Sequence, residues 1–251
     1  MATRRANFLA RQLPSGGRVL EIGCGRGILL ETLVNRGFEV HGVELHEQAF
    51  QGIDPRVKQH VSETLSDLHF PAGHFDEVII WHVLEHLPDP RGTVREIRRI
   101  LKPGGVMVVA VPNFASWQSR WSKNAWFHLD LPRHLFHFPV ESLKRLITRE
   151  GLHCTGTHHF SLRQNPFGWL QSALNRWSWL PRNGLYVLLQ RRPAGEPPPF
   201  CFRTRCLLWL VWWAGIPEAL AVSIVEAVFC RGATVHIVAR APLVEQVECL
   251  E

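Results

Sequence analysis

The sequence lacks any CxxC pair, although it contains six cysteines. They are scattered from Cys24 to Cys249, so neither a cysteine-based zinc site nor a disulfide framework is indicated. The basic N-terminal stretch, which contains Arg4, Arg5 and Arg11, also lacks the apolar core of a signal peptide. Together these absences favour a protein of the reducing cytoplasm.

The sequence has no dense run of lysine or arginine, no internal repeat and no recognised base-flipping motif. These absences argue against an enzyme that acts on nucleic acid. The net charge of +6 nevertheless indicates an attraction to some anionic partner, whether nucleic acid, an acidic membrane surface or a charged small molecule. Tryptophan is nearly absent from the first part of the chain, where only Trp81 precedes Trp117. The later part therefore carries large aromatic surfaces that need burial.

Short apolar runs alternate with segments of helical spacing along most of the chain. The predicted strands cover residues 18–22, 38–43, 57–61, 75–81, 106–111, 152–161 and 233–240, and the predicted helices cover 28–36, 92–101 and 141–151. A turn is expected at Lys102–Gly105, and the proline-rich stretch 191–199 is linker-like. This alternation predicts an α/β fold, with seven strands in a mostly parallel sheet and helices on both faces.

A glycine-rich turn follows the first predicted strand and precedes the first predicted helix. Gly23, Gly25 and Gly27 form a GxGxG pattern, whereas the dinucleotide fingerprint GxGxxG would need its third glycine at Ile28. Such a turn lets backbone N–H groups approach an anionic or polar ligand beside the positive end of a helix. Glu44 ends the second strand, where sheets of this kind place an acid that binds ribose hydroxyls.

Three blocks carry a resemblance to a known family. Residues 19–27 (VLEIGCGRG) resemble the first motif of class I S-adenosylmethionine-dependent methyltransferases, and residues 75–86 and 101–105 resemble its later blocks. The similarity is greatest to the group that includes 3-demethylubiquinone O-methyltransferase, a subset of which also has a segment similar to residues 130–138. The resemblance implies a Rossmann-like fold and S-adenosylmethionine as the methyl donor.

The resemblance also implies roles for individual residues. Glu21 and the turn formed by Gly23, Cys24, Gly25 and Gly27 would hold the methionine part of the donor, and Glu44 its ribose. The end of the fourth strand, with Trp81 and His82, would lie beside the donor. Many relatives have an aspartate that faces the adenine; here Thr64 and Leu65 stand at that place, and Glu63 or Asp67 could substitute for it.

His82, Glu85 and His86 spell HxxEH, which also matches an inverted zinc-protease motif. On a helix the two histidines would share one face. Pro88 and Pro90 follow at once, however, so we expect no metal and instead take His82 and His86 as candidate general bases on the acceptor side. A divalent ion held by this run is the minor alternative. Three further histidines are candidates for the base or for ordinary structural roles: His128, His134 and His137.

We therefore expect methyl transfer by in-line displacement, to a hydroxyl of a small-molecule or lipid-linked acceptor. The alternatives are a non-catalytic binding module with the donor fold and a nucleic-acid methyltransferase. Two insertions, 113–139 and 162–232, leave the predicted sheet at its carboxyl edge, which is the ligand-binding edge of parallel sheets. We expect them to form an acceptor-binding cap within a single domain of residues 1–251.

The second insertion contains an apolar stretch, 206–230, that only Glu218 and Glu226 interrupt with charge. A buried helix pair is favoured, and a helix lying on a membrane surface or spanning the membrane is the alternative. Arg203, Arg205 and Arg231 flank the stretch, as a surface anchor would require. We therefore also expect that this stretch can make peripheral contact with the inner membrane surface.

Overall fold

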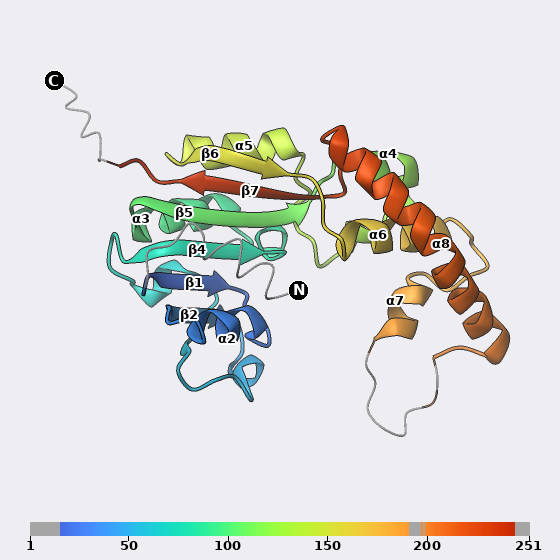
Figure 1. Cartoon of the computed structure of the whole chain (residues 1–251), viewed down its shortest axis with the longest axis horizontal. Coiled ribbons are helices and arrows are strands. Elements are labelled where there is room, and N and C mark those ends of the chain that lie inside the picture. Colours follow the sequence, from blue (N-terminus) through green and yellow to red (C-terminus); the bar gives the residue numbers. More distant parts are fainter. Residues whose placement is uncertain (1–15, 191–196, 198, 244–251) are drawn as a thin grey trace. The chain divides into compact units, whose positions relative to one another are not determined.

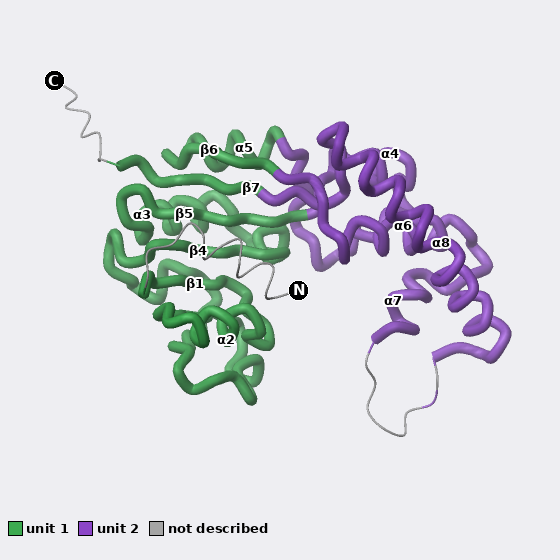
Figure 2. The backbone as a smooth tube through the Cα atoms, viewed as in Figure 1, with its two compact units in different colours: residues 1–111, 141–157, 237–251 green, residues 112–140, 158–236 purple. Residues whose placement is uncertain are grey.

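The computed structural model describes residues 16–190, 197 and 199–243. Two compact units divide them (Figure 2). Among the described residues, unit 1 consists of residues 16–111, Glu141–Thr157 and residues 237–243. Unit 2 consists of Pro112–Val140 and the described part of His158–His236. The expected linker 191–199 lies outside the described residues apart from two of its prolines, as do the N-terminal arginines and Cys249.

Seven strands form one sheet in the order β3-β2-β1-β4-β5-β7-β6 (Figure 1). The strands are β1 Arg18–Ile22, β2 Glu39–Glu44, β3 Lys58–Val61, β4 Phe75–Trp81, β5 Leu101–Pro112, β6 His153–His158 and β7 Thr234–Arg240. The pairs β1–β2, β1–β4, β2–β3 and β4–β5 are parallel, whereas the arrow of β7 is reversed. The predicted seven-stranded, mostly parallel sheet is confirmed.

Hydrophobic runs explain why β4 and β5 lie at the centre of the sheet. The side chains of Val78, Ile79 and Ile80 are fully buried, as are those of the run Met107–Val111 within one per cent. A strand covered on both faces needs such continuous apolar runs. Strand β5 begins at Leu101, five residues earlier than predicted. The prediction of a turn at Lys102–Gly105 is therefore wrong. These residues enter the strand because Leu101 already pairs with Phe75, with a register shift before Glu77.

The helices of unit 1 are α2 Ile28–Val34, α3 Pro90–Ile100 and α5 Val140–Arg149. The start of α3 follows from local chemistry, because the Asp89 carboxylate accepts a hydrogen bond from the Gly92 N–H at 2.8 Å and Pro90 occupies the first turn. Apolar side chains at helical spacing, among them Val94, Ile97 and Ile100, are buried. Leu30 and Leu33 of α2 are likewise buried, in a hydrophobic cluster with residues of the sheet.

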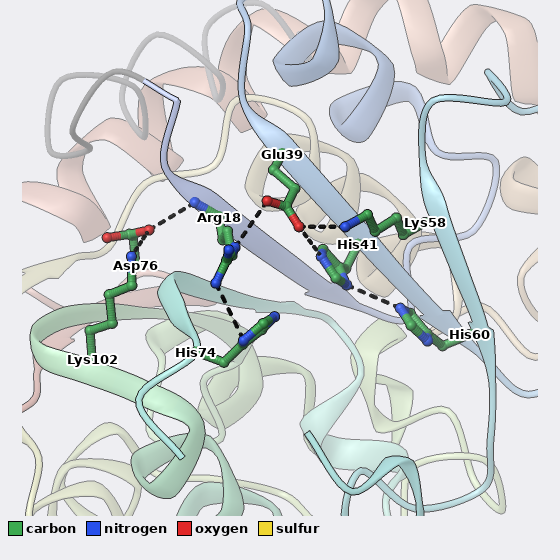
Figure 3. Close-up of polar contacts among 8 residues, drawn as sticks. All are labelled: Arg18, Glu39, His41, Lys58, His60, His74, Asp76 and Lys102. Carbon is green, nitrogen blue, oxygen red and sulfur yellow. Dashed lines mark hydrogen bonds and ion pairs between the residues drawn. The ribbon is translucent and has the colours of Figure 1, made fainter. Parts of the chain in front are cut away.

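A polar network follows the amino-terminal starts of the strands (Figure 3). The Glu39 carboxylate accepts hydrogen bonds from Lys58 Nζ at 2.6 Å and Arg18 Nε at 2.9 Å, and lies 3.1 Å from His41 Nε2. These bonds, that of Lys58 first, lower the pKa of Glu39 to about 2. Burial lowers the pKa of His41 to about 4. His60 completes the row, with Nε2 3.1 Å from His41 Nδ1.

The helices of unit 2 are α4 Trp117–Ser122, α6 Gln164–Leu174, α7 Gly184–Leu189 and α8 Phe202–Val228. Leucines from the last three of them, including Leu170, Leu185 and Leu208, form their common core. Figure 1 shows α8 as one continuous helix, so the expected helix pair is wrong. Proline has no N–H, so the carbonyl four residues before Pro217 loses its helical hydrogen bond. Because Pro217 is exposed, water can satisfy that carbonyl and the helix continues through this residue.

Candidate functional site

The glycine-rich turn connects β1 with α2. The N–H of Gly23 donates to the carbonyl of Val43 at 2.9 Å, and the N–H of Gly27 donates to that of Cys24 at 3.0 Å. Gly23 must lack a side chain, because a Cβ there would lie 2.2 Å from Val83 Cγ2. At Gly25, by contrast, φ is +54° and a Cβ would meet nothing within 4 Å. The backbone of Gly25 therefore faces open space that a ligand can enter.

Glu44, the last residue of β2, reaches this turn. One carboxylate oxygen accepts a hydrogen bond from the Gly25 N–H at 2.5 Å, and the other accepts one from the Leu45 N–H at 3.3 Å. A carboxylate has about four lone-pair sites, so these two bonds leave acceptor capacity for ligand hydroxyls. The carboxylate of Glu44 thus lies beside the glycine-rich turn.

Two carboxylates converge on the same spot. Glu21, near the end of β1, is only 6% exposed. Burial, followed by the charges of Glu21 and Glu44, raises the pKa of the Cys24 thiol to about 12. Cys24 is therefore a neutral thiol and no nucleophile. The two acids make the potential around the turn negative, which suits a ligand with positively charged groups.

Two neighbouring strands contribute residues to this turn. Val83 follows β4 and packs against Gly23, and it belongs to the block 75–86 that carries the family resemblance. Gly42 of β2 was not predicted to contribute. A Cβ there would lie 2.8 Å from Cys24 Sγ, so the strand must pass close to the turn. In the sequence Gly42 has the character of an ordinary strand position, and only the pairing of β1 with β2 brings it to the turn.

Thr64 and Leu65 lie between β3 and the 3-10 helix Ser66–Leu68. Thr64 is exposed, and its hydroxyl accepts a hydrogen bond from the Asp67 N–H at 3.3 Å. Leu65 is buried. Since β3 runs parallel to β2, this segment leaves the sheet at the same carboxyl edge as Glu44. Their assignment to the adenine stays a prediction.

The HxxEH run does not lie on an α-helix, so its two histidines do not share the helical face that the inverted zinc-protease motif would need. Trp81 ends β4, His82 has a left-handed backbone with φ of +55°, and only Leu84–His86 form a 3-10 turn. The His82 N–H donates to the carbonyl of Ala110 at 2.8 Å, which continues the β4–β5 ladder by one residue. His82 thus lies next to the donor turn, because Ile80 pairs with Ile22.

The side chain of His82 is oriented by a buried acid. Its Nδ1 lies 3.3 Å from Oε1 of Glu85, which is 1% exposed. Nε2 of His82 is buried and has no hydrogen-bond partner among the described residues. If Nδ1 carries the proton that faces Glu85, Nε2 presents a lone pair and can accept a proton. A non-glycine residue with this backbone is uncommon and is found most often at functional sites.

Two histidines of unit 2 have structural partners. Nδ1 of His134 lies 2.8 Å from the carbonyl of His128, and Nε2 of His137 lies 2.9 Å from the carbonyl of Leu129. Both rings therefore hold the loop that follows α4. This arrangement favours the structural role for His134 and His137 over that of a general base.

Comparisons with known proteins agree with this geometry. The family model described as "Methyltransferase domain" matches residues 1–156. The ubiquinone biosynthesis O-methyltransferase of Psychrobacter cryohalolentis is 36% identical over 108 residues, which are 39% of this chain and 42% of that protein. The enzyme of the same name from Alkalilimnicola ehrlichii is 35% identical over 120 residues, 43% of this chain and 48% of that protein. The chain therefore spans less than half the length of these relatives.

Solved structures share the fold. An S-adenosylmethionine-dependent methyltransferase from Archaeoglobus fulgidus has a TM-score of 0.58 at 20% identity, covering 96% of this chain and 94% of its own. Phosphoethanolamine N-methyltransferase 2 of Haemonchus contortus, in complex with S-adenosylmethionine, has a TM-score of 0.57 at 18% identity, covering 96% and 52%. The chain belongs to the methyltransferase domain family, and has the Rossmann-like fold of proteins that use S-adenosylmethionine as methyl donor.

Proposed function

We propose that the protein transfers the methyl group of S-adenosylmethionine to a hydroxyl of a small-molecule or lipid-linked acceptor. One observation carries the donor assignment: the open backbone of Gly25 lies against the carboxylate of Glu44. The turn would hold the methionine part and Glu44 the ribose hydroxyls. The negative charges of Glu21 and Glu44 complement the positive sulfonium and ammonium groups of the donor.

The reaction needs one proton acceptor beside the donor. A bond forms between the acceptor oxygen and the methyl carbon while the bond from that carbon to sulfur breaks, and the electron pair stays on sulfur. The hydroxyl proton must leave, and we assign its removal to Nε2 of His82, with Glu85 as the positioning residue at Nδ1. His86, two residues beyond Leu84 in the same 3-10 turn, is the second candidate.

Unit 2 is our candidate for the acceptor-binding part. Both of its segments begin where a parallel strand reaches its carboxyl end, at Pro112, the last residue of β5, and at His158, the last residue of β6. Ligands of open α/β sheets bind outside these ends. The names of the relatives support oxygen as the methylated atom. The five described cysteines are free thiols, which agrees with the proposed cytoplasmic location.

The first experiment is calorimetry of the purified protein with S-adenosylhomocysteine, S-adenosylmethionine and NAD. We expect binding of both sulfur ligands and none of NAD. Binding of NAD alone would contradict the donor assignment. The second experiment incubates the protein with methyl-labelled donor and extracts of cell lipids and metabolites, then identifies the labelled product. Donor binding without any labelled product would favour the non-catalytic binding module.

A further inference from the structure

Helix α8 presents an uncharged apolar face to the outside. It is 27 residues long, about 40 Å, and among the described residues it is the helix long and apolar enough to cross a membrane. Only 17% of its most apolar window is buried, so it is no core helix. We call its exposed apolar row the outer stripe, and its members follow one another at intervals of three or four residues: Leu210, Trp213, Pro217, Ala221, Ile224 and Val228.

The two acids of α8 are kept off the outer stripe. Glu226 is fully buried inside unit 2, where its carboxylate accepts hydrogen bonds from the Gln118 N–H and from Trp169 Nε1, each at 2.8 Å. Burial raises the pKa of Glu226 to about 7. Glu218 follows Pro217 and is therefore turned about 100° away from the stripe along the helix. Its side chain is exposed and lies at the groove between α8 and α6.

That groove extends the apolar surface beside the stripe. It has a volume of about 440 Å³ and is lined by Trp169 and Leu170 of α6 and by Ala214, Gly215 and Val222 of α8. Gly215 allows the two helices to approach closely, because a Cβ there would lie 2.6 Å from Leu170 Cδ2. Soluble proteins rarely leave this much contiguous apolar surface without a partner.

The ends of the stripe identify the partner. Arg203 and Arg205 lie in the first turn of α8, and Arg231 follows its last turn. Trp209 and Trp213 lie in the first half of α8, on the side of Arg203 and Arg205, and their side chains are 40% and 70% exposed. An apolar helix face bordered by exposed tryptophans and arginines is typical of helices that bind the surface of anionic membranes. A protein partner gives no reason for arginines at both ends of an uncharged stripe.

The inner face of α8 decides how such a helix would lie. Leu208 and Ala219 are packed in the core of unit 2, on the side opposite the stripe. A membrane-spanning α8 would carry the buried polar groups packed behind it, including Glu226 and Gln118, into the hydrocarbon. We propose that the outer stripe inserts into the headgroup region of an anionic lipid bilayer, with α8 parallel to the membrane plane. This inference does not depend on the proposed methyl transfer.

Flotation of the whole chain with lipid vesicles tests the proposal. We expect binding to vesicles of phosphatidylcholine with phosphatidylglycerol, weaker binding to phosphatidylcholine alone, and release as salt is raised. The variant Leu210→Glu/Trp213→Glu should bind at least about tenfold less tightly, since both side chains are exposed and the fold does not need them. Arg203→Glu should weaken binding to phosphatidylglycerol about fivefold or more. Leu131→Glu is the matched control, at the same 66% exposure as Leu210.

Any one of four outcomes would overturn the proposal. The wild-type chain could fail to float, or the stripe variant could float as well as Leu131→Glu. The bound protein could resist an alkaline carbonate wash, which would show a spanning helix. Sedimentation could also reveal a dimer that only the stripe variant dissociates, in which case a second copy covers the stripe. Calorimetry with S-adenosylhomocysteine on each variant reports separately on unit 1, so a failed donor assignment and a failed membrane assignment remain distinguishable.

Discussion

The two units of this chain place their hydrophobic side chains in opposite ways. In unit 1 the large hydrophobic side chains are buried around the sheet, and those that are exposed are Ile28, Leu45, Val61 and Leu243 among the described residues. All the other exposed large hydrophobic side chains that the structure describes lie in unit 2. Unit 1 thus exposes few large hydrophobic side chains to water, whereas unit 2 exposes many.

The interior of unit 2 contains buried polar groups as well as hydrophobic ones. Unit 2 buries a polar network in which Gln118 donates from Nε2 to the carbonyl of Asn165 and accepts at Oε1 from Trp126 Nε1. A network of this kind specifies one arrangement of the surrounding helices. The exposed apolar surface of unit 2 therefore belongs to a well-packed body rather than to a loosely collapsed one. The comparison therefore assigns the two proposals to different units, donor binding to unit 1 and contact with an apolar partner to unit 2, and the following experiments test each of them separately.

The largest effect is expected for Gly25→Val, which should abolish donor binding in calorimetry. The new side chain would occupy the space where the ligand must approach the backbone, and φ of +54° adds strain. Gly37→Val is the control, because Gly37 also has a positive φ and open space around it, but lies after α2. Equal loss of binding in both variants would mean that strain in unit 1, not blocked access, is responsible.

His82→Asn should lower kcat by about a hundredfold or more while donor affinity changes little, because the proton acceptor is lost. Asparagine tolerates the left-handed backbone, so the fold should be retained. Turnover is measured with the acceptor that the methylation screen identifies, and donor affinity is measured by calorimetry. His137→Asn in unit 2 serves as the comparison; if it slows turnover as strongly, the assignment of the base to unit 1 is wrong.

Glu44→Ala should weaken binding of S-adenosylhomocysteine by about 1–3 kcal/mol, since the ribose hydroxyls lose a charged acceptor. Glu47→Ala, three residues further along at an exposed position, is the matched control and should bind normally. Calorimetry measures both. An unchanged affinity in Glu44→Ala would remove Glu44 from the donor site.

The smallest effect is expected at the amino edge of unit 1, where pH should change stability. Burial lowers the pKa of His41 from 6.5 to about 4, so the unfolded chain binds the proton more readily than the folded one. The contribution of His41 is complete above pH 6.5 and is lost as pH falls towards 4, by about 3 kcal/mol at most. His41→Phe should reduce this dependence in urea unfolding followed by circular dichroism, leaving the contributions of His60 and His74, whose pKa values burial also lowers. His46→Phe, at an exposed position, should leave the dependence unchanged.

Glu77 complicates the profile in a way that can be tested. Burial raises the pKa of this β4 carboxyl to about 8, so its contribution is complete below pH 4.5 and is lost as pH rises towards 8. Between pH 4.5 and 6.5 the two groups therefore oppose each other. Glu77→Gln should make the rise in stability from pH 4.5 to 6.5 steeper than in the wild type. Loss of that rise in Glu77→Gln would contradict the assignment of the acid limb to His41.

Much of unit 1 could be predicted because its signals are local. The strand ends, the GxGxG turn and the acid at the end of β2 lie within short segments whose spacing reflects one strand–turn–helix pattern. The left-handed backbone of His82 was not predicted, since it depends on the ladder to Ala110 of β5. The contact of Gly42 with the glycine-rich turn was missed for the same reason, because it depends on the pairing of β2 with β1.

The sequence alone predicted the alternation of strands and helices, the glycine-rich turn with Glu44 at the end of the next strand, and a long apolar segment after residue 205. Only the tertiary structure decided what that segment is. The carboxylate of Glu226 is held on the inner face of α8 by hydrogen bonds from Gln118 and Trp169. These two residues lie 108 and 57 positions away from Glu226 in the sequence. Local periodicity carries no information about such distant donors, because hydrogen bonds between segments form only when their helices pack together.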